Sequence, residues 1–160
     1  MKRSLFIVLA CVVCFIIEFL LFNYVSPWLR PSLIIILLVF ADIFWNVRSA
    51  VLVALVGGML EDSFGMTFGF NMVAYSVCVL AASFLGDYIY QKGSRSSLVV
   101  LLFFVLGVNV LVRFLLLAMV DQGISVGMVL SGITVDIVVT LLVANITFNG
   151  LIRCALKLYA

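Results

Sequence analysis

The sequence predicts an all-α integral membrane protein with six transmembrane helices in a single transmembrane domain, residues 1–160. Composition is the first indication: 67% of the residues are hydrophobic, 10% are charged and the mean hydropathy is +1.42, far outside the balance of a soluble domain. The second indication is the position of the charged residues, most of which fall between apolar runs long enough to cross a hydrocarbon core about 30 Å thick. Little of the chain remains for a soluble domain.

Six apolar runs define the predicted spans, which cover about residues 5–22, 32–45, 49–60, 72–90, 98–120 and 128–148. The second span opens at Pro31, whose missing N–H costs nothing in the first turn of a helix. A helix of 14 residues rises only about 21 Å at 1.5 Å per residue. The second and third spans must therefore extend into their flanks, thin the bilayer, or form a hairpin partly covered by neighbouring helices. These alternatives stay open.

Basic residues orient the predicted spans. Six crossings place both termini on one side of the membrane, and Arg30 is then the one basic residue on the other side. Arg113 lies within a span. The positive-inside rule therefore predicts that both termini are cytoplasmic. The basic residues on the cytoplasmic side are Lys2, Arg3, Arg48, Lys92, Arg95, Arg153 and Lys157.

Several function classes are disfavoured by the composition. A net charge of +2 without a dense basic cluster argues against nucleic-acid binding. Histidine is absent, which removes the commonest general base and metal ligand. The sequence also contains no H-E-x-x-H, G-x-S-x-G or phosphate-binding loop motif. We therefore expect a protein that is not an enzyme and has no cofactor or metal site.

Two ionisable residues lie well inside apolar runs, Arg113 in the fifth and Asp136 in the sixth. Their positions place both at roughly 10 to 12 Å below the same surface, on consecutive antiparallel helices. An isolated charge in hydrocarbon costs about 2.5 to 3.5 kcal/mol on insertion scales, so we predict an ion pair between them. The pair is either a structural lock or part of a substrate or proton site. Asn109 lies one turn from Arg113 on the same face and extends this polar network.

A predicted hairpin joins the third and fourth spans. The third run contains the Gly57-Gly58 pair and ends at Glu61 and Asp62, which we expect to face the external side. Glycines mark the turn, and the next run begins at Asn71. The motif is either a partner-binding or a structural element, and the acids alone are equally typical of a membrane boundary. Its residues are Gly57, Gly58, Asp62, Gly65, Gly69 and Asn71, with Pro31 opening the preceding span.

This order of features resembles the MreD family of bacterial rod shape-determining membrane proteins. The matching residues run from Arg30-Pro31, through the GGMLEDSFGMTFGFN stretch, to Tyr75. Family members usually have leucine where this chain has Glu61 and Phe70. The strong part of the resemblance covers about residues 30–90, and beyond it the similarity is in length and in the six-span pattern.

The resemblance implies a function and a fold. The implied function is a non-catalytic scaffold in the bacterial inner membrane, which binds MreC and helps couple cytoplasmic MreB filaments to peptidoglycan synthesis by RodA and its transpeptidase. The implied fold is similar to the substrate-binding subunits of energy-coupling-factor vitamin transporters. A vitamin-binding subunit of such a transporter is therefore the alternative function.

Overall fold

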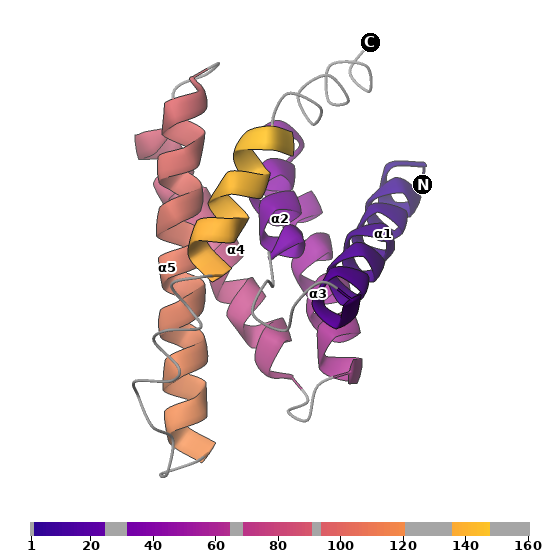
Figure 1. Ribbon diagram of the computed structural model, residues 1–160. Coiled ribbons are helices and arrows are strands. Elements are labelled where there is room, and N and C mark those ends of the chain that lie inside the picture. Colours follow the sequence, from indigo (N-terminus) through magenta and orange to yellow (C-terminus); the bar gives the residue numbers. More distant parts are fainter. Residues whose placement is uncertain (1, 25–31, 65–68, 91–93, 121–135, 148–160) are drawn as a thin grey trace.

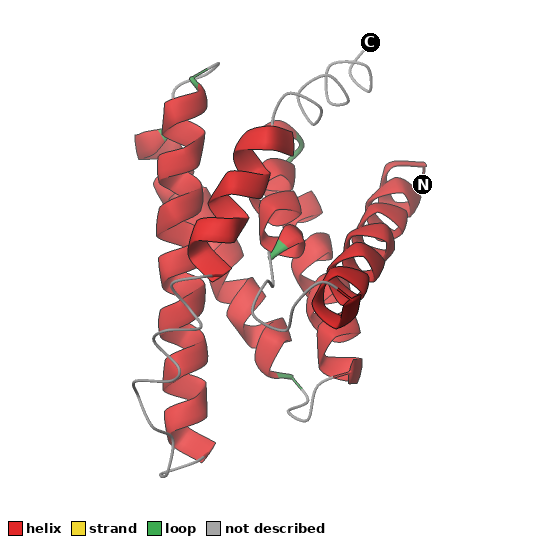
Figure 2. Cartoon of the chain, viewed as in Figure 1, coloured by secondary structure: helices red, strands yellow, loops and turns green. Residues whose placement is uncertain are grey.

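The computed structural model describes residues 2–24, 32–64, 69–90, 94–120 and 136–147, and nearly all of these residues are helical (Figures 1 and 2). The predicted all-α class is confirmed, since this part of the chain contains no strand. The helices are α1 (Lys2–Tyr24), α2 (Leu33–Phe44), α3 (Val47–Phe64), α4 (Phe70–Ile89), α5 (Arg95–Val120) and a further helix, Asp136–Thr147.

Each of the first five predicted spans coincides with one helix, and the largest difference is in the third. That span was predicted to end before the two acids, whereas α3 continues to Phe64 and includes both. The acids are also buried: Glu61 is 8% exposed and Asp62 is 3% exposed. The two acids are therefore covered by the protein, and their hydrogen-bond partners lie inside it. That they lie on the external side of the membrane stays a prediction. Of the sixth predicted span, residues 128–135 and 148 lie outside the described residues.

The short helix α2 is the centre of the bundle. Residues 34–41 are all buried, on every side of the helix. A helix that is apolar all round is stable only when neighbours cover every face. Helices α1, α3, α4 and α5 all contact it. Its shortness is explained by this central position, since its surface is covered by protein rather than by lipid or water.

Successive helices run in opposite directions (Figure 1). Two hydrogen bonds tie α2 to helices far away in the sequence. The Ser83 hydroxyl of α4 donates to Asp42 Oδ1 at 2.8 Å, and the backbone N–H of Ser32 donates to Thr140 Oγ1 at 3.0 Å. The latter bond fixes the start of α2 against the 136–147 helix.

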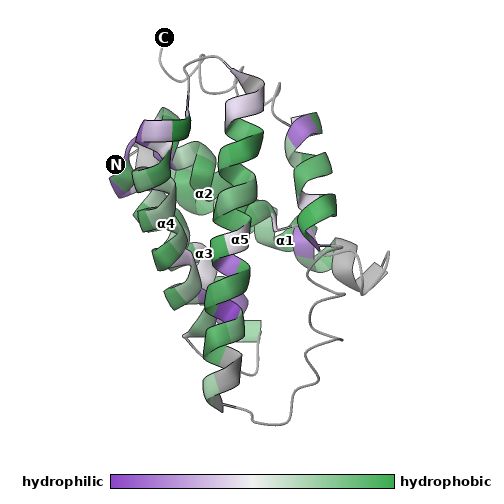
Figure 3. Ribbon diagram, turned by 90° about the vertical axis from the view of Figure 1, so that its left-hand side faces the viewer, coloured by the Kyte–Doolittle hydropathy of each residue, from purple (hydrophilic) through white to green (hydrophobic). Residues whose placement is uncertain are grey.

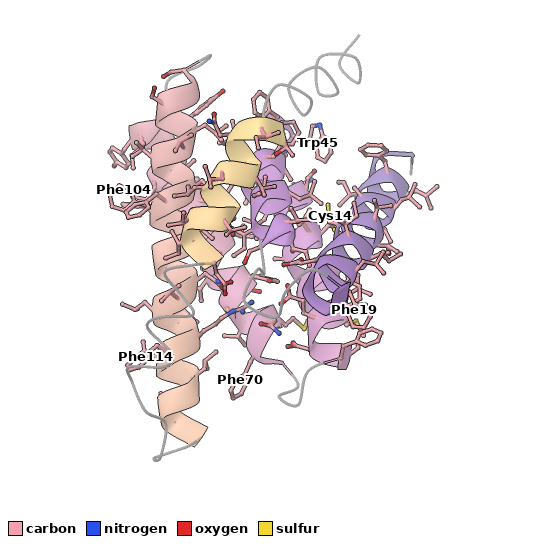
Figure 4. The ribbon with its side chains drawn as sticks, in the orientation of Figure 1. Cys14, Phe19, Trp45, Phe70, Phe104 and Phe114 are labelled. Carbon is pink, nitrogen blue, oxygen red and sulfur yellow. The ribbon has the colours of Figure 1, made fainter. Side chains whose placement is uncertain are left out.

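The described helices consist largely of apolar residues (Figure 3), and many of their large apolar side chains are exposed. Phe104 and Phe114 of α5, for example, point away from the bundle (Figure 4). By length and composition, two described helices can cross a membrane: Phe70–Ile89 and Ser96–Leu116. Exposed apolar surface on this scale is typical of contact with lipid or with partner proteins.

Candidate functional site

The carboxylate of Asp62 caps the beginning of α4. Its Oδ2 accepts the backbone N–H of Gly69 at 3.0 Å and that of Met72 at 3.2 Å, and its Oδ1 accepts that of Asn71 at 3.0 Å. The first N–H groups of a helix have no partner within the helix, and the N-terminus carries a partial positive charge. Asp62, at the end of α3, therefore supplies α4 with acceptors for its first N–H groups and with a negative charge near its N-terminus, and it closes the hairpin.

Gly69 and Asn71 contribute to this cap in different ways. Gly69 is the residue before α4 and has a φ of +92°, a conformation that L side chains rarely adopt. No atom lies within 4 Å of the position where its Cβ would be, so backbone conformation and not space requires glycine. Asn71 contributes its backbone N–H.

Gly58 lies where α3 touches the first turn of α4. A Cβ on Gly58 would be 2.6 Å from the Cα and 2.8 Å from the N of Met72. Backbone atoms cannot rotate away as a side chain can, so any other residue here would push the helices apart. Its neighbour Gly57 faces α2 instead, where a Cβ would meet Cγ2 of Ile34 at 2.5 Å.

The described residues of the predicted motif thus make contacts within this chain, by close packing of the glycines and by capping of α4. Gly57 and Gly58 are both buried, and α4 occupies the face of Gly58. Gly65 and Pro31 lie outside the described residues.

A second group of polar side chains joins α3, α4 and α5. Nη2 of Arg113 donates to Oε2 of Glu61 at 3.2 Å and to the hydroxyl oxygen of Tyr75 at 3.1 Å. The Tyr75 hydroxyl in turn donates to Oε1 of Glu61. The guanidinium carbon also lies 5.6 Å from the centre of the Tyr75 ring. We call these three residues the polar triad.

The position of α4 explains the geometry of the polar triad. Both α3 and α5 pack against α4, so the long side chain of Arg113 reaches past Tyr75 to the carboxylate beyond it. Tyr75 is fully buried and the Glu61 side chain is 6% exposed, whereas that of Arg113 is 34% exposed. A buried carboxylate is tolerated when it is paired and hydrogen-bonded. Both oxygens of Glu61 meet this condition.

Arg113 therefore binds the carboxylate of Glu61, which the sequence did not single out as its partner. Interhelical packing brings this residue, 52 positions away in the sequence, into reach. The ion pair between Arg113 and Asp136 stays a prediction. Asp136 begins the 136–147 helix, where its backbone carbonyl accepts the hydroxyl of Thr140 at 2.6 Å.

Two further polar residues lie close to the polar triad. Glu18 of α1 is 6% exposed and interacts electrostatically with Tyr75 and Arg113. Asn109 of α5 is 5% exposed. Among the described residues, Oδ1 of Asn109 and Nε of Arg113 are buried atoms without a hydrogen-bond partner. The site thus combines a set of formed contacts with an unused acceptor on Asn109 and an unused donor on Arg113.

Sequence reasoning missed Glu61 and Tyr75 as members of a polar site. The sequence did contain a signal for this contact. Residues that precede and follow a short hairpin loop lie near one another, and Tyr75 lies only about one helical turn into the helix that follows the loop. Glu61 was instead interpreted as a boundary residue, since it stands next to Asp62. In the described part of the chain, no three Cys, Asp or Glu side chains are grouped as metal ligands.

Comparison with protein-family models, curated proteins and solved structures finds no match to this chain.

Proposed function

We propose that this chain is a non-catalytic membrane scaffold of the bacterial cell-elongation machinery, with the role of MreD proteins. The observation that carries the proposal is the joint between α3 and α4. The described residues of the motif on which the resemblance rests act there by close packing and capping. A motif whose contacts build a helix hairpin fits a protein that holds partners in place.

The proposed setting is the bacterial inner membrane, crossed six times, with both termini in the cytoplasm. Three observations support it: the alternating directions of the described helices (Figure 1), their exposed apolar side chains, and two helices long and apolar enough to span a bilayer. The short helix α2 fits the same setting, because its neighbours cover it on all sides. It need not match the bilayer thickness by itself.

The proposed direct partner is an MreC-like protein with a single transmembrane helix. Helix association in lipid depends on close packing and not on exclusion from water. Since α4 already covers Gly58, the partner helix must use a face that remains exposed. One such face lies on α4, where Leu80 is 69% and Phe84 is 68% exposed. RodA, its transpeptidase and MreB are then reached indirectly.

Affinity purification from native membranes tests the proposal. The tagged chain is extracted in a mild detergent, and its co-purifying proteins are identified by mass spectrometry against an unrelated multi-pass protein with the same tag. Recovery of an MreC-like protein with wall-synthesis enzymes is the expected result. Absence of such proteins from a well-folded preparation would contradict it.

A pair of variants then locates the partner face. Leu80→Trp changes the exposed face of α4, and Leu142→Trp is its matched control on the 136–147 helix, where Leu142 is 59% exposed. Loss of the partner with Leu80→Trp alone identifies the α4 face. Loss with Leu142→Trp alone assigns the contact to the other helix.

One observation favours the alternative, a vitamin-binding subunit of an energy-coupling-factor transporter. Ligand sites combine apolar walls with a few convergent polar groups, and Asn109 and Arg113 supply unused polar atoms inside the bundle. The same purification distinguishes the two functions, because this alternative predicts recovery of paired ATPases with a transmembrane coupling subunit.

A further inference from the structure

Two buried polar atoms beside the polar triad have unused hydrogen-bonding capacity. Oδ1 of Asn109 is an acceptor and Nε of Arg113 is a donor, and neither has a partner among the described residues. The two residues are four positions apart on α5, so they lie on one face of the helix. Buried polar groups in proteins are nearly always hydrogen-bonded, to the protein or to a bound molecule. Two such atoms on one face therefore indicate an occupant.

The chemistry of the two atoms restricts the occupant. A partner for both must donate to Oδ1 of Asn109 and accept from Nε of Arg113. An ammonium group only donates, and a carboxylate or phosphate without protons only accepts. An anion is further disfavoured because two carboxylates, Glu61 and Glu18, already interact with Arg113. A hydroxyl group, which both donates and accepts, fits the pair.

Access agrees with this chemistry. The Arg113 side chain is 34% exposed, so the site is not sealed within the core.

We propose that a hydroxyl oxygen binds between Asn109 Oδ1 and Arg113 Nε and completes the polar network of α3, α4 and α5. It belongs to a bound water molecule or to a hydroxyl-bearing small molecule held beside the polar triad. The proposal does not depend on the scaffold function, since it rests only on contacts within this chain.

Radiolytic hydroxyl-radical labelling of the purified protein tests for water. A bound water produces radicals where it sits, so it labels a neighbouring side chain even when bulk solvent cannot reach it. Tyr75 is the reporter, since it has no exposed surface and its hydroxyl is bonded to Arg113. Tyr88, which is 77% exposed, is the positive control, and the fully buried Cys11 of α1 is the negative control.

Native mass spectrometry of the same preparation tests for a small molecule. A bound ligand adds mass to the intact chain, whereas water is lost on desolvation. The proposal expects either labelling of Tyr75 or a defined additional mass. If Tyr75 remains as unlabelled as Cys11 and the mass equals that of the chain alone, the proposal is overturned.

A variant connects either signal to the proposed atoms. Asn109→Leu removes the acceptor at similar size, and Asn145→Leu is the matched control on the exposed surface of the 136–147 helix. The signal should fall at least several-fold in the first variant and persist in the second. An unchanged signal in folded Asn109→Leu overturns the proposal. If Asn109→Leu does not fold, Asn109→Val removes the same acceptor with a smaller side chain and is judged by the same criterion.

Discussion

Glu61 and Arg113 lie 52 residues apart in the sequence and form an ion pair with 3.2 Å between Oε2 and Nη2. The pair links α3 to α5, while Tyr75 of α4 is hydrogen-bonded to both partners. Three helices are therefore held together by one set of polar contacts inside an apolar bundle. The stability of the folded protein should therefore fall when a member of the polar triad is replaced.

Glu61→Gln should destabilise the protein by about 1 to 3 kcal/mol. Glutamine keeps the shape but removes the negative charge, and the loss of one member of a buried pair costs about 3 to 5 kcal/mol. We expect less than that here because the Arg113 side chain is 34% exposed, so water can solvate the guanidinium when its partner charge is removed. Chemical unfolding in detergent, followed by circular dichroism, measures the change. Asp87→Asn, at an exposed carboxylate of α4, is the control, and equal losses in both variants would contradict the prediction.

Tyr75→Phe should cost about 1 to 2 kcal/mol, because it removes a hydroxyl that donates to Glu61 and accepts from Arg113 while keeping the buried ring. The matched control is Tyr88→Phe at a tyrosine that is 77% exposed. The same unfolding measurement compares the two. A Tyr75→Phe protein as stable as the wild type would show that the hydroxyl is not needed between the two charges.

Asp62→Ala should lower stability by about 1.5 to 3 kcal/mol, because the first turn of α4 loses a charged acceptor for its N–H groups. Asp62→Asn should fall between the wild type and the alanine variant, since the amide keeps one acceptor oxygen. Ser63→Ala is the control at an exposed neighbour that bonds only within α3. Hydrogen exchange of the α4 amides measures the effect, and uniform protection across the three variants would rule out the cap.

Gly58→Ala should reduce both the yield of folded protein and its melting temperature. Alanine in place of glycine normally favours a helix by about 1 kcal/mol, but here the added Cβ would be 2.6 Å from the backbone of Met72. Gly86→Ala and Gly107→Ala are matched controls, since no atom lies within 4 Å of either added Cβ. These controls should match or exceed wild-type stability. A Gly58→Ala protein that behaves like them would refute the close contact between α3 and α4.

Most of the helical architecture could be predicted from the chain alone. The apolar runs located the first five helices to within a few residues, because a run bounded by polar loops must satisfy its backbone hydrogen bonds internally. The predicted third span ends too early, at residue 60, since adjacent acids are usual at the end of a membrane helix, whereas α3 continues to Phe64. A structural role for Gly58 and Asp62 could also be predicted, because they are four residues apart and so lie on one face of the helix.

The amino-acid sequence by itself determined the helical class, the apolar character and the position of the α3–α4 hairpin, because these depend on local composition and on turn residues. Tertiary structure alone decided that Glu61 binds Arg113 and that α4 covers the face of Gly58. Both depend on which helices pack together across the bundle. Glu61 and Arg113 are 52 residues apart in the sequence, and α4, which packs against both α3 and α5, brings them together.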